Sequence, residues 1–234
     1  MKSTILDKTK LVNSVFSKVY KKYDLMNDIM SFGVHRIWKE KFIDWMSPCP
    51  NSKLIDVASG TGDIARLFSE QNINTSQVTC IEPNEEMFNL GKKNLIEMKN
   101  INWIKAPAED LPVKDNVYDY YSISYGIRNV TDINKTLKEA YRVLKPGGRF
   151  MCLEFSKIDN ESLNFFYKQY SKAIPLIGKF VVGTSEPYEY LIKSIDKFYS
   201  QNQLIKLMCD NGFSRTQYRN LSNGVSAIHS GWKI

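Results

Sequence analysis

With 234 residues, of which 43% are hydrophobic, the chain can bury a sizeable core in one domain or in one domain with an insertion. It has no apolar run near ~20 residues, no signal-peptide pattern and no arginine before Arg36, which argues against a spanning helix, secretion and a transit peptide. The net charge of +7 is typical of a protein that binds nucleic acid or an anionic membrane surface, but solvated surface lysines explain it as well.

The N-terminal residues 1–50 are predicted to form a helical cap. Residues 1–22 form an arm in which Val12, Val15 and Val19 have helical spacing. A segment rich in aromatic residues and methionine follows, and a second helix at about 36–46 ends at the proline-rich break 47–50. From the residues alone, a cap packed on the core, with His35 as a buried histidine, is as good an interpretation as a binding role.

An apolar strand and a glycine turn organise the rest of the chain. Leu54, Ile55 and Val57 predict a buried parallel strand, and the turn at 58–62 has only small side chains, so a ligand can lie against its backbone. A helix begins at Asp63. A plain turn with a capping aspartate is the alternative without a ligand.

Two cofactors fit this turn. Residues 60–65 match G-x-G-x-x-A, the dinucleotide fingerprint, which leaves a nicotinamide cofactor open. Asp56, at the tip of the strand, favours S-adenosylmethionine instead. A carboxylate there repels a pyrophosphate, whereas it attracts the cationic amino-acid end of S-adenosylmethionine.

Strands and helices alternate from residue 53 onward. Further strands are predicted at 78–81, 101–106, 117–124 and 149–153. One helix begins after the N-cap Asn84, and another covers 132–144 and ends at Lys-Pro-Gly-Gly. Repeated units of this kind predict a mainly parallel, right-handed sheet.

Candidate ligand-binding residues follow the strands. Glu82, at the end of the second strand, is placed to accept hydrogen bonds from ribose hydroxyls, although a surface glutamate is the alternative. The loop at 107–112 suits an adenine ring, and the loop at 125–130 follows the fourth strand. In open α/β sheets ligands bind at the carboxyl ends of strands, so these sites are mutually consistent.

Residues 157–200 interrupt the alternation and predict an inserted helical lid. Apolar and aromatic side chains at 163–182 are interleaved with lysines, a pattern of membrane-interface helices, with an ordinary helical subdomain as the alternative. A last helix at 201–210 and a hairpin of 213–220 with 225–229 complete the core. The predicted units are therefore 1–50, 51–156, 157–200 and 201–234. The cysteines show no C-x-x-C spacing and are predicted to be small core residues in a reducing compartment rather than metal ligands or disulfides: Cys49, Cys80, Cys152 and Cys209.

Several segments resemble the ubiquinone/menaquinone biosynthesis C-methyltransferases, a family of class I S-adenosylmethionine-dependent methyltransferases. Residues 23–38 resemble the family's N-terminal signature, and residues 142–156 resemble its second signature. Residues 126–132 and 221–231 are similar as well, so the resemblance covers about Val12 to the end. The chain departs from the family pattern where it has Ser59 for a frequent Gly, Glu82 for Asp and Pro107 for Asn.

The resemblance implies a Rossmann-like α/β fold with a seven-stranded, mainly parallel sheet, one antiparallel strand and helices on both faces. It implies methyl transfer from S-adenosylmethionine, without a metal, to a ring carbon of 2-polyprenyl-6-methoxy-1,4-benzoquinol, of demethylmenaquinol or of both. Such an enzyme is expected in the cytoplasm, peripherally bound to the inner face of the membrane. A homodimer or a quinone-biosynthesis complex is a further expectation.

The resemblance also implies two sets of site residues. The expected cofactor contacts are Asp56, Gly60, Thr61, Gly62, Glu82, Pro107, Ala108 and Ser124. The expected quinol-side residues are Tyr23, Asp24, His35, Arg128 and Asn129. Among these, Arg128 is expected to stabilise a phenolate or orient a water, and Asp24 and His35 are alternative bases.

Two other functions compete with quinol methylation. A nucleic-acid methyltransferase is disfavoured, because no Asp/Asn-Pro-Pro-aromatic motif and no Pro-Cys nucleophile follow the fourth strand; residues 124–126 read Ser-Tyr-Gly instead. A nicotinamide-dependent oxidoreductase remains the alternative that the glycine pattern leaves open.

Overall fold

A seven-stranded sheet forms the centre of the protein. The computed structural model describes residues 12, 14, 15, 17, 23–31, 33–71, 76–158, 170 and 185–234. The strand order is β3-β2-β1-β4-β5-β7-β6, and β7 runs antiparallel to both of its neighbours while the other pairs are parallel. The prediction of a mainly parallel sheet with one antiparallel strand is confirmed.

The strand boundaries agree with the predicted ones to within two residues, except at the start of β5 and at the end of β7, which reaches Trp232 rather than His229. β3 ends at Ile104 rather than Ala106. β5 begins at Leu144 rather than Arg149, because residues 145–148 bulge out between two paired positions: Leu144 pairs with Tyr118, and Arg149 pairs with Tyr120. The strands are β1 (Lys53–Val57), β2 (Gln77–Ile81), β3 (Ile101–Ile104), β4 (Tyr118–Ser124), β5 (Leu144–Phe155), β6 (Ser214–Leu221) and β7 (Ser226–Trp232).

Several helices begin at side chains that satisfy free backbone N–H groups. Asn84, as predicted, caps α5 by accepting a hydrogen bond from the N–H of Met87 at 3.0 Å, and Asp132 caps α6 in the same way. The helices are α2 (Tyr23–Ser31), α3 (His35–Met46), α4 (Asp63–Gln71), α5 (Glu85–Asn94), α6 (Ile133–Val143), α8 (Glu186–Lys197) and α9 (Gln201–Asp210), with short 3-10 turns η2 (Ile127–Asn129) and η3 (Ser222–Gly224).

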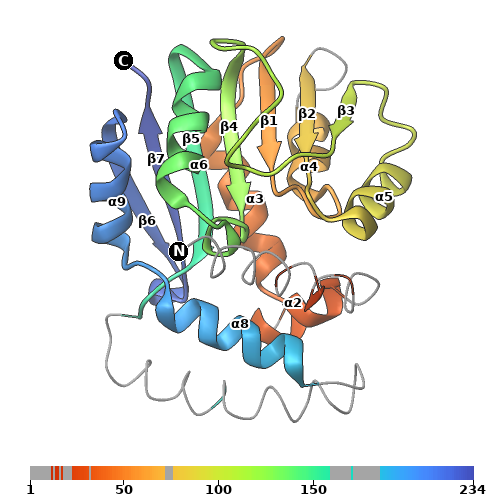
Figure 1. Cartoon of the computed structure of the whole chain (residues 1–234), viewed down its shortest axis with the longest axis vertical. Helices are drawn as coiled ribbons and strands as arrows, with labels where there is room; N and C mark the ends of the chain where they lie inside the picture. The colour runs from red at the N-terminus through yellow and green to blue at the C-terminus, as the bar shows by residue number, and fades with distance from the viewer. Residues whose placement is uncertain are drawn as a thin grey trace.

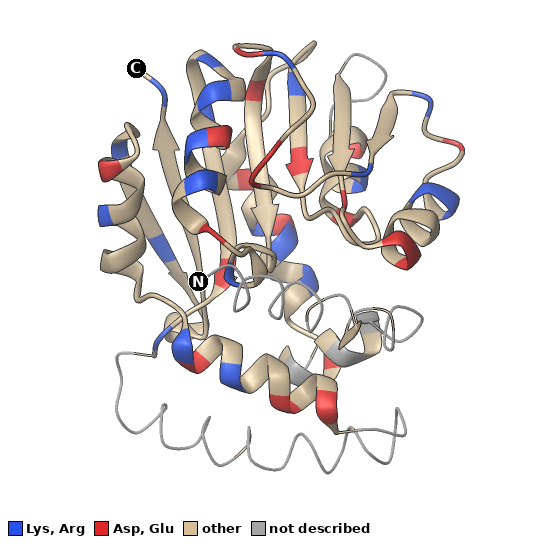
Figure 2. Cartoon of the chain, viewed as in Figure 1, with Lys and Arg blue, Asp and Glu red and all other residues tan. Residues whose placement is uncertain are grey.

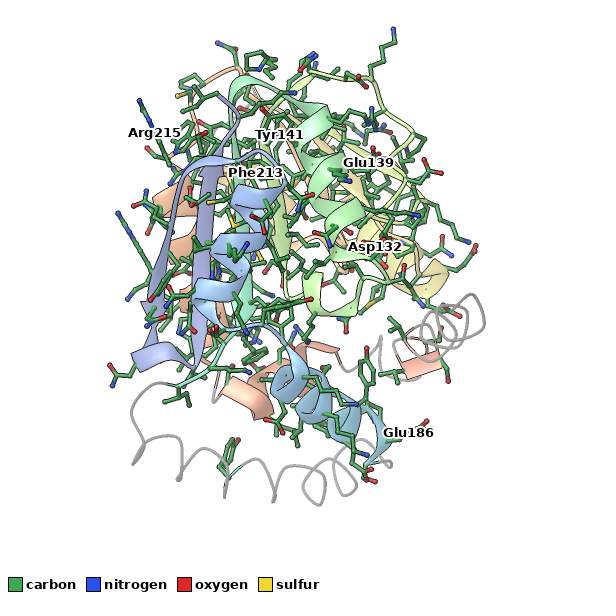
Figure 3. The ribbon with its side chains drawn as sticks, turned by 60° about the vertical axis from the view of Figure 1, so that its left-hand side comes forward. Asp132, Glu139, Tyr141, Glu186, Phe213 and Arg215 are labelled. Atoms are coloured by element: carbon green, nitrogen blue, oxygen red, sulfur yellow. The ribbon has the colours of Figure 1, made fainter. Side chains whose placement is uncertain are left out.

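Helices cover both faces of the sheet, which explains the apolar strands. On β1, Leu54 packs in a cluster that includes α3 and α4, whereas Ile55 and Val57 pack in a cluster that includes α6 and α9. Figure 1 shows α6 and α9 in front of the sheet and α3 and α4 behind it. Figure 3 shows Tyr141 of α6 beside Phe213, with ring centroids 5.3 Å apart.

The cysteine prediction holds for only two residues. Cys80 and Cys152 are buried in the sheet, but Cys49 and Cys209 are exposed. Cys49 lies in the loop after α3. Cys209 follows the buried Met208 on α9, and one residue along a helix turns a side chain by roughly a quarter of the circumference, away from the core.

The ends of the parallel strands meet further helices. In Figure 1, α2 and α8 lie at the end of the sheet toward which β1 and β4 point. α8 is a helix within the predicted insertion at 157–200, whereas the segment 163–182 lies outside the described residues apart from Tyr170. No helix among the described residues has both the length and the apolar character needed to cross a membrane.

Candidate cofactor and acceptor site

Two adjoining cavities open at the carboxyl ends of β1, β2 and β4. The larger has a volume of about 150 Å³ and the smaller about 30 Å³. Ala58, Gly60, Ser124 and Tyr125 line both of them, so the cavities meet at the glycine turn. Both cavities therefore lie at the carboxyl ends of the strands, where the candidate site residues were expected to gather.

The two glycines of the turn have different roles. Both have positive φ angles, +56° at Gly60 and +89° at Gly62. A Cβ atom at Gly62 would lie 2.5 Å from Cδ1 of Leu95, whereas a Cβ atom at Gly60 would meet nothing within 4 Å. Gly62 is thus required by packing and lies outside the lining of both cavities, whereas Gly60 leaves open space beside its backbone.

Glu82 joins the turn to the end of β2. Its Oε2 accepts a hydrogen bond from the N–H of Gly60 at 2.9 Å, and its Oε1 accepts one from the N–H of Asn84 at 2.9 Å. Burial raises the pKa of Glu82 to about 7, although both backbone groups favour the charged form. Glu82 lines the larger cavity, and each carboxylate oxygen can accept a further hydrogen bond there.

Asp56 is a buried acid beside the smaller cavity. The Ser122 hydroxyl donates a hydrogen bond to its Oδ1 at 2.6 Å, while its Oδ2 has no partner among the described residues. Burial raises the pKa of Asp56 to about 7. A cationic ligand group would compensate this acid, because an unpaired buried charge is costly.

Lys39 and Asp63 complete the smaller cavity, and sequence reasoning missed both as site residues. The Lys39 ammonium lies 2.5 Å from Oδ2 of Asp63 and thereby joins α3 to α4. Burial alone would raise the pKa of Asp63, but Lys39 outweighs it and holds the pKa below the ordinary value. The only signal was position: Lys39 follows His35 by one helical turn, on the buried face of α3.

The larger cavity brings together further predicted cofactor contacts. Pro107, Ala108 and Ser124 line it, and the Ser124 hydroxyl is buried without a partner among the described residues. The loop at 107–112 is held in place by Glu109, whose Oε1 accepts hydrogen bonds from the N–H and the hydroxyl of Thr131, each at 2.6 Å. Thr61 lines the smaller cavity.

Asn129 is the predicted acceptor-side residue that lines the larger cavity. Its Oδ1 accepts a hydrogen bond from the hydroxyl of Tyr190 at 3.0 Å, and its Nδ2 donates one to the carbonyl of Tyr125 at 3.4 Å. Arg128, its neighbour in η2, is buried in an ion pair with Glu154 and donates to the same carbonyl at 2.8 Å. Arg128 thus lies behind the wall of the larger cavity.

His35, Tyr23 and Asp24 lie on the N-terminal helices. His35 is buried, with Nε2 2.9 Å from Oδ1 of Asp28, and its Nδ1 has no partner in the described part of the chain. Burial, followed by the charge of Lys39, lowers the pKa of His35, so the neutral ring is favoured. Tyr23 and Asp24 begin α2, but their side chains lie outside the described residues.

The residues present fit S-adenosylmethionine. This compound carries an ammonium, a carboxylate and a positively charged sulfur, and the smaller cavity offers Asp56 and Asp63 with Lys39. Its adenosine part needs acceptors for two ribose hydroxyls and a flat apolar slot, which Glu82 and the 107–108 loop provide. Within the described ranges, no group of three or more His, Cys, Asp or Glu side chains is placed to hold a metal ion.

The chain matches known methyltransferases along its whole length. The family model described as the ubiE/COQ5 methyltransferase family matches residues 3–233. The ubiquinone/menaquinone biosynthesis C-methyltransferase UbiE of Rickettsia bellii (strain OSU 85-389) is 51% identical, over 97% of this chain and 94% of the relative. The protein of the same name from Brucella abortus (strain S19) is 46% identical, over 97% of this chain and 87% of the relative.

Solved structures share the fold. A SAM-dependent methyltransferase from Thermotoga maritima, described as a possible histamine N-methyltransferase, has a TM-score of 0.67 at 21% identity and covers 94% of this chain and 99% of its own. The phosphoethanolamine N-methyltransferase 2 of Haemonchus contortus, solved with S-adenosyl-L-methionine, has a TM-score of 0.63 at 14% identity, over 84% of this chain and 52% of its own. These likenesses confirm the Rossmann-like methyltransferase architecture.

Proposed function

The chain belongs to the ubiE/COQ5 methyltransferase family, and we propose that it methylates a ring carbon of a polyprenylated quinol. It is a S-adenosylmethionine-dependent C-methyltransferase of ubiquinone/menaquinone biosynthesis. The acceptor we propose is 2-polyprenyl-6-methoxy-1,4-benzoquinol, demethylmenaquinol or both. The observation that carries the proposal is the pair of adjoining cavities, one acidic and one shaped for adenosine, with Asn129 at the wall of the larger.

In this proposal the cofactor lies across the glycine turn. Asp56, Asp63 and Lys39 face its amino-acid end together with Thr61 and the Gly60 backbone. Opposite charges meet there, because the cofactor's net positive charge compensates two acids and one lysine. Glu82 holds the ribose hydroxyls, and Pro107, Ala108 and the unpaired Ser124 hydroxyl face the adenine.

The chemistry requires alignment and control of a proton. S-adenosylmethionine supplies an electrophilic methyl group on a positively charged sulfur. The acceptor's ring carbon becomes nucleophilic once an ortho hydroxyl loses its proton; it then forms a bond to the methyl group and gives up its own proton. The chain's main tasks are therefore to hold the ring in line and to stabilise the phenolate.

We propose that Asn129 and Arg128 serve the phenolate. Asn129 lines the larger cavity, and we assign its side of that cavity to the acceptor ring and the side of Glu82 and Pro107 to adenosine. Arg128, ion-paired with Glu154, lies behind the wall and donates to the Tyr125 carbonyl that also holds Asn129, so in this proposal it acts by positioning Asn129. His35 and Asp24 remain the proposed bases, with Tyr23 beside the ring, and the Asp28 contact orients the His35 imidazole.

The acceptor's isoprenoid tail suggests where the enzyme works. We propose that it binds peripherally to the inner, cytoplasmic face of the membrane, where such a lipid lies, and that the apolar, lysine-containing insertion at 163–182 faces the tail. Figure 2 shows both positive and negative residues on each of α5, α6, α8 and α9, which favours a quinol over nucleic acid as the partner. Homodimers and a quinone-biosynthesis complex remain predictions.

Complementation tests the proposed function. The chain is expressed in a bacterial strain that lacks the quinone C-methyltransferase, and lipid extracts are analysed by mass. We expect the demethylated benzoquinone, the demethylated menaquinone or both to be converted to the methylated forms. Persistence of both demethylated quinones, with the protein folded and present, would contradict the proposal. An Asp56→Asn variant serves as the matched negative control.

A further inference from the structure

We propose that Tyr190 of α8 is a positioning residue for methyl transfer, which fixes the side-chain amide of Asn129 so that its N–H end faces the acceptor oxygen. This inference rests on the proposed function. It assigns a task to the inserted segment 157–200, which departs from the alternation of strands and helices in the sequence. In this arrangement the acceptor oxygen meets a hydrogen-bond donor at the cavity wall.

The geometry joins two distant parts of the chain. Figure 1 shows α8 crossing below the ends of the parallel strands. From there the Tyr190 hydroxyl donates a hydrogen bond at 3.0 Å to Oδ1 of Asn129, a residue 61 positions earlier in the sequence. Asn129 lines the larger cavity. Tyr190 therefore reaches the site through Asn129, although it does not itself line the cavity.

Two contacts fix the orientation of the Asn129 amide. The amide oxygen accepts a hydrogen bond from the Tyr190 hydroxyl, and one N–H of Nδ2 donates to the carbonyl oxygen of Tyr125 at 3.4 Å. A flipped amide would place its oxygen against that carbonyl oxygen, and two acceptors repel each other. An amide nitrogen has two N–H donors. The second N–H has no other partner within the described residues and is left for the acceptor.

A donor at this position suits the reaction. The acceptor must become a phenolate before its ring carbon can attack, and a preset N–H group stabilises the negative oxygen more than the neutral hydroxyl. If the amide were free to rotate, its carbonyl oxygen would face the phenolate for part of the time and repel it. The Tyr125 carbonyl disfavours the flipped amide, and the Tyr190 hydrogen bond holds the amide against rotation.

The surroundings keep Tyr190 a hydrogen-bond donor. Burial raises the pKa of Tyr190, and although Arg128 opposes this, the hydroxyl stays protonated over the working pH range. A second tyrosine on α8 provides a matched control. The hydroxyl of Tyr188 is buried and has no partner among the described residues. Tyr188→Phe therefore removes the same atom from the same helix without touching Asn129.

The experiment compares Tyr190→Phe with Tyr188→Phe in the full-length chain. We expect Tyr190→Phe to lower kcat for the polyprenyl quinol about tenfold, the worth of one buried hydrogen bond. The affinity for S-adenosylhomocysteine and Tm should be unchanged. The rising limb of the kcat–pH profile should move upward by about half a unit or more, because the phenolate is less stabilised. Tyr188→Phe should stay within about twofold of the wild type.

A double-mutant cycle separates positioning from a general packing effect. In an Asn129→Ala background, Tyr190→Phe should have no further effect on kcat, because both act through one amide. An equal loss in both backgrounds, or a Tyr190→Phe variant that behaves like Tyr188→Phe, would overturn the inference. Should Tyr190→Phe fail to fold, Asn129→Asp replaces it: this variant still accepts from Tyr190 but lacks the donor, so full activity would also overturn the inference.

The two proposals fail in different ways. A wild-type chain that transfers no methyl group to any quinol contradicts the proposed function. An active wild type whose Tyr190→Phe variant keeps its kcat and pH profile contradicts the positioning role alone.

Discussion

The backbone N–H of Gly60 donates a hydrogen bond to the Glu82 carboxylate at 2.9 Å. The other Glu82 oxygen accepts from the N–H of Asn84, the N-cap of α5. One buried acid therefore holds together the glycine turn after β1, the end of β2 and the start of α5. The same acid lines the larger cavity, so the group that shapes the turn is also the one that we propose for the ribose hydroxyls.

Two replacements of Glu82 should show whether cofactor binding depends on its negative charge or on the length of its side chain. Glu82→Gln loses the negative charge, and its amide nitrogen cannot accept from a backbone N–H. We expect it to weaken S-adenosylhomocysteine binding about 10–100-fold, the range for lost charge-assisted hydrogen bonds. Glu82→Asp keeps the charge and should lose less. Calorimetric titration measures both, and a Gln variant that binds within twofold of the wild type would refute the ribose contact.

The stability of the free protein and the stabilising effect of the cofactor should respond to pH in opposite directions. Asp56 and Glu82 have pKa values of about 7 in the folded chain, above their ordinary values of 3.8 and 4.5. Between these limits the folded state holds more protons than the unfolded state, so the free energy of unfolding of the ligand-free chain falls as pH rises toward about 7. The cationic cofactor instead favours ionised Asp56, so its stabilising effect should grow over the same range.

Thermal melting at pH 6 and pH 8, with and without S-adenosylmethionine, measures both trends. The increase in Tm caused by the cofactor should be larger at pH 8. A cofactor effect that is constant, or larger at pH 6, would show that Asp56 does not face a cation.

Asp56→Asn should stabilise the empty protein and weaken cofactor binding at the same time. The amide keeps the shape of the side chain but removes a buried, partly unpaired charge, so at pH 8 Tm should rise by a few degrees, corresponding to about 1 kcal/mol. Cofactor affinity should fall about tenfold or more. The exposed Asp196 of α8 gives the control, since Asp196→Asn should change neither quantity. A destabilised Asp56→Asn variant with normal affinity would reverse the assignment.

Substitution by alanine should lower stability at Gly91 and cofactor affinity at Gly60. A Cβ atom at Gly91 would lie 2.3 Å from Cη2 of Trp103 and 2.8 Å from the carbonyl oxygen of Gly60, so Gly91→Ala should cost about 1–3 kcal/mol of stability through overpacking. Gly60→Ala has open space and a modest backbone cost of about 1 kcal/mol. Its methyl group, however, would occupy open space beside the two cavities that we assign to the cofactor.

Chemical denaturation and cofactor titration of both variants check this contrast. Gly60→Ala should lose more affinity than stability, and Gly91→Ala the reverse. Equal behaviour of the two variants would contradict the packing of α5 against the turn.

Replacing Lys39, which lies on the N-terminal helix α3, by methionine should weaken cofactor binding. The substitution removes the charge that pairs with Asp63 at 2.5 Å and faces the smaller cavity. We expect the Kd for S-adenosylmethionine to rise at least about tenfold, within the range for losing one partner of a buried charge pair. Lys41, exposed on the same helix, supplies the control variant Lys41→Met. Normal affinity in Lys39→Met would exclude Lys39 from the cofactor site.

Much of this arrangement was predictable because it depends on local patterns. Alternating strands and helices put Asp56, Glu82 and Ser124 at the same edge of the sheet, and a glycine turn after an apolar strand indicates where a ligand approaches the backbone. Lys39 and Tyr190 were not predictable. Each reaches the site through tertiary contacts of a helix outside the repeating units, and nothing in its sequence neighbourhood specifies that contact.

Two details that sequence reasoning missed, in β5 and in α9, have a similar origin. β5 begins at Leu144 because this residue pairs with Tyr118. Lys-Pro-Gly-Gly therefore forms a bulge within the strand instead of a loop before it. The exposure of Cys209 depends on which face of α9 packs on the sheet. Both are decided by neighbouring elements rather than by the residues themselves.

The most direct test of quinol methylation is transfer of a labelled methyl group by the purified full-length chain. The protein is incubated in detergent micelles with S-adenosylmethionine carrying a ¹³C-labelled methyl group and, in parallel, with a demethylated polyprenyl benzoquinol and with demethylmenaquinol, each in the reduced form. We predict that at least one acceptor gains a single labelled methyl group, which mass fragmentation places on a ring carbon. No label in either quinol, or label found only on an oxygen, from a protein that binds S-adenosylmethionine would contradict the account.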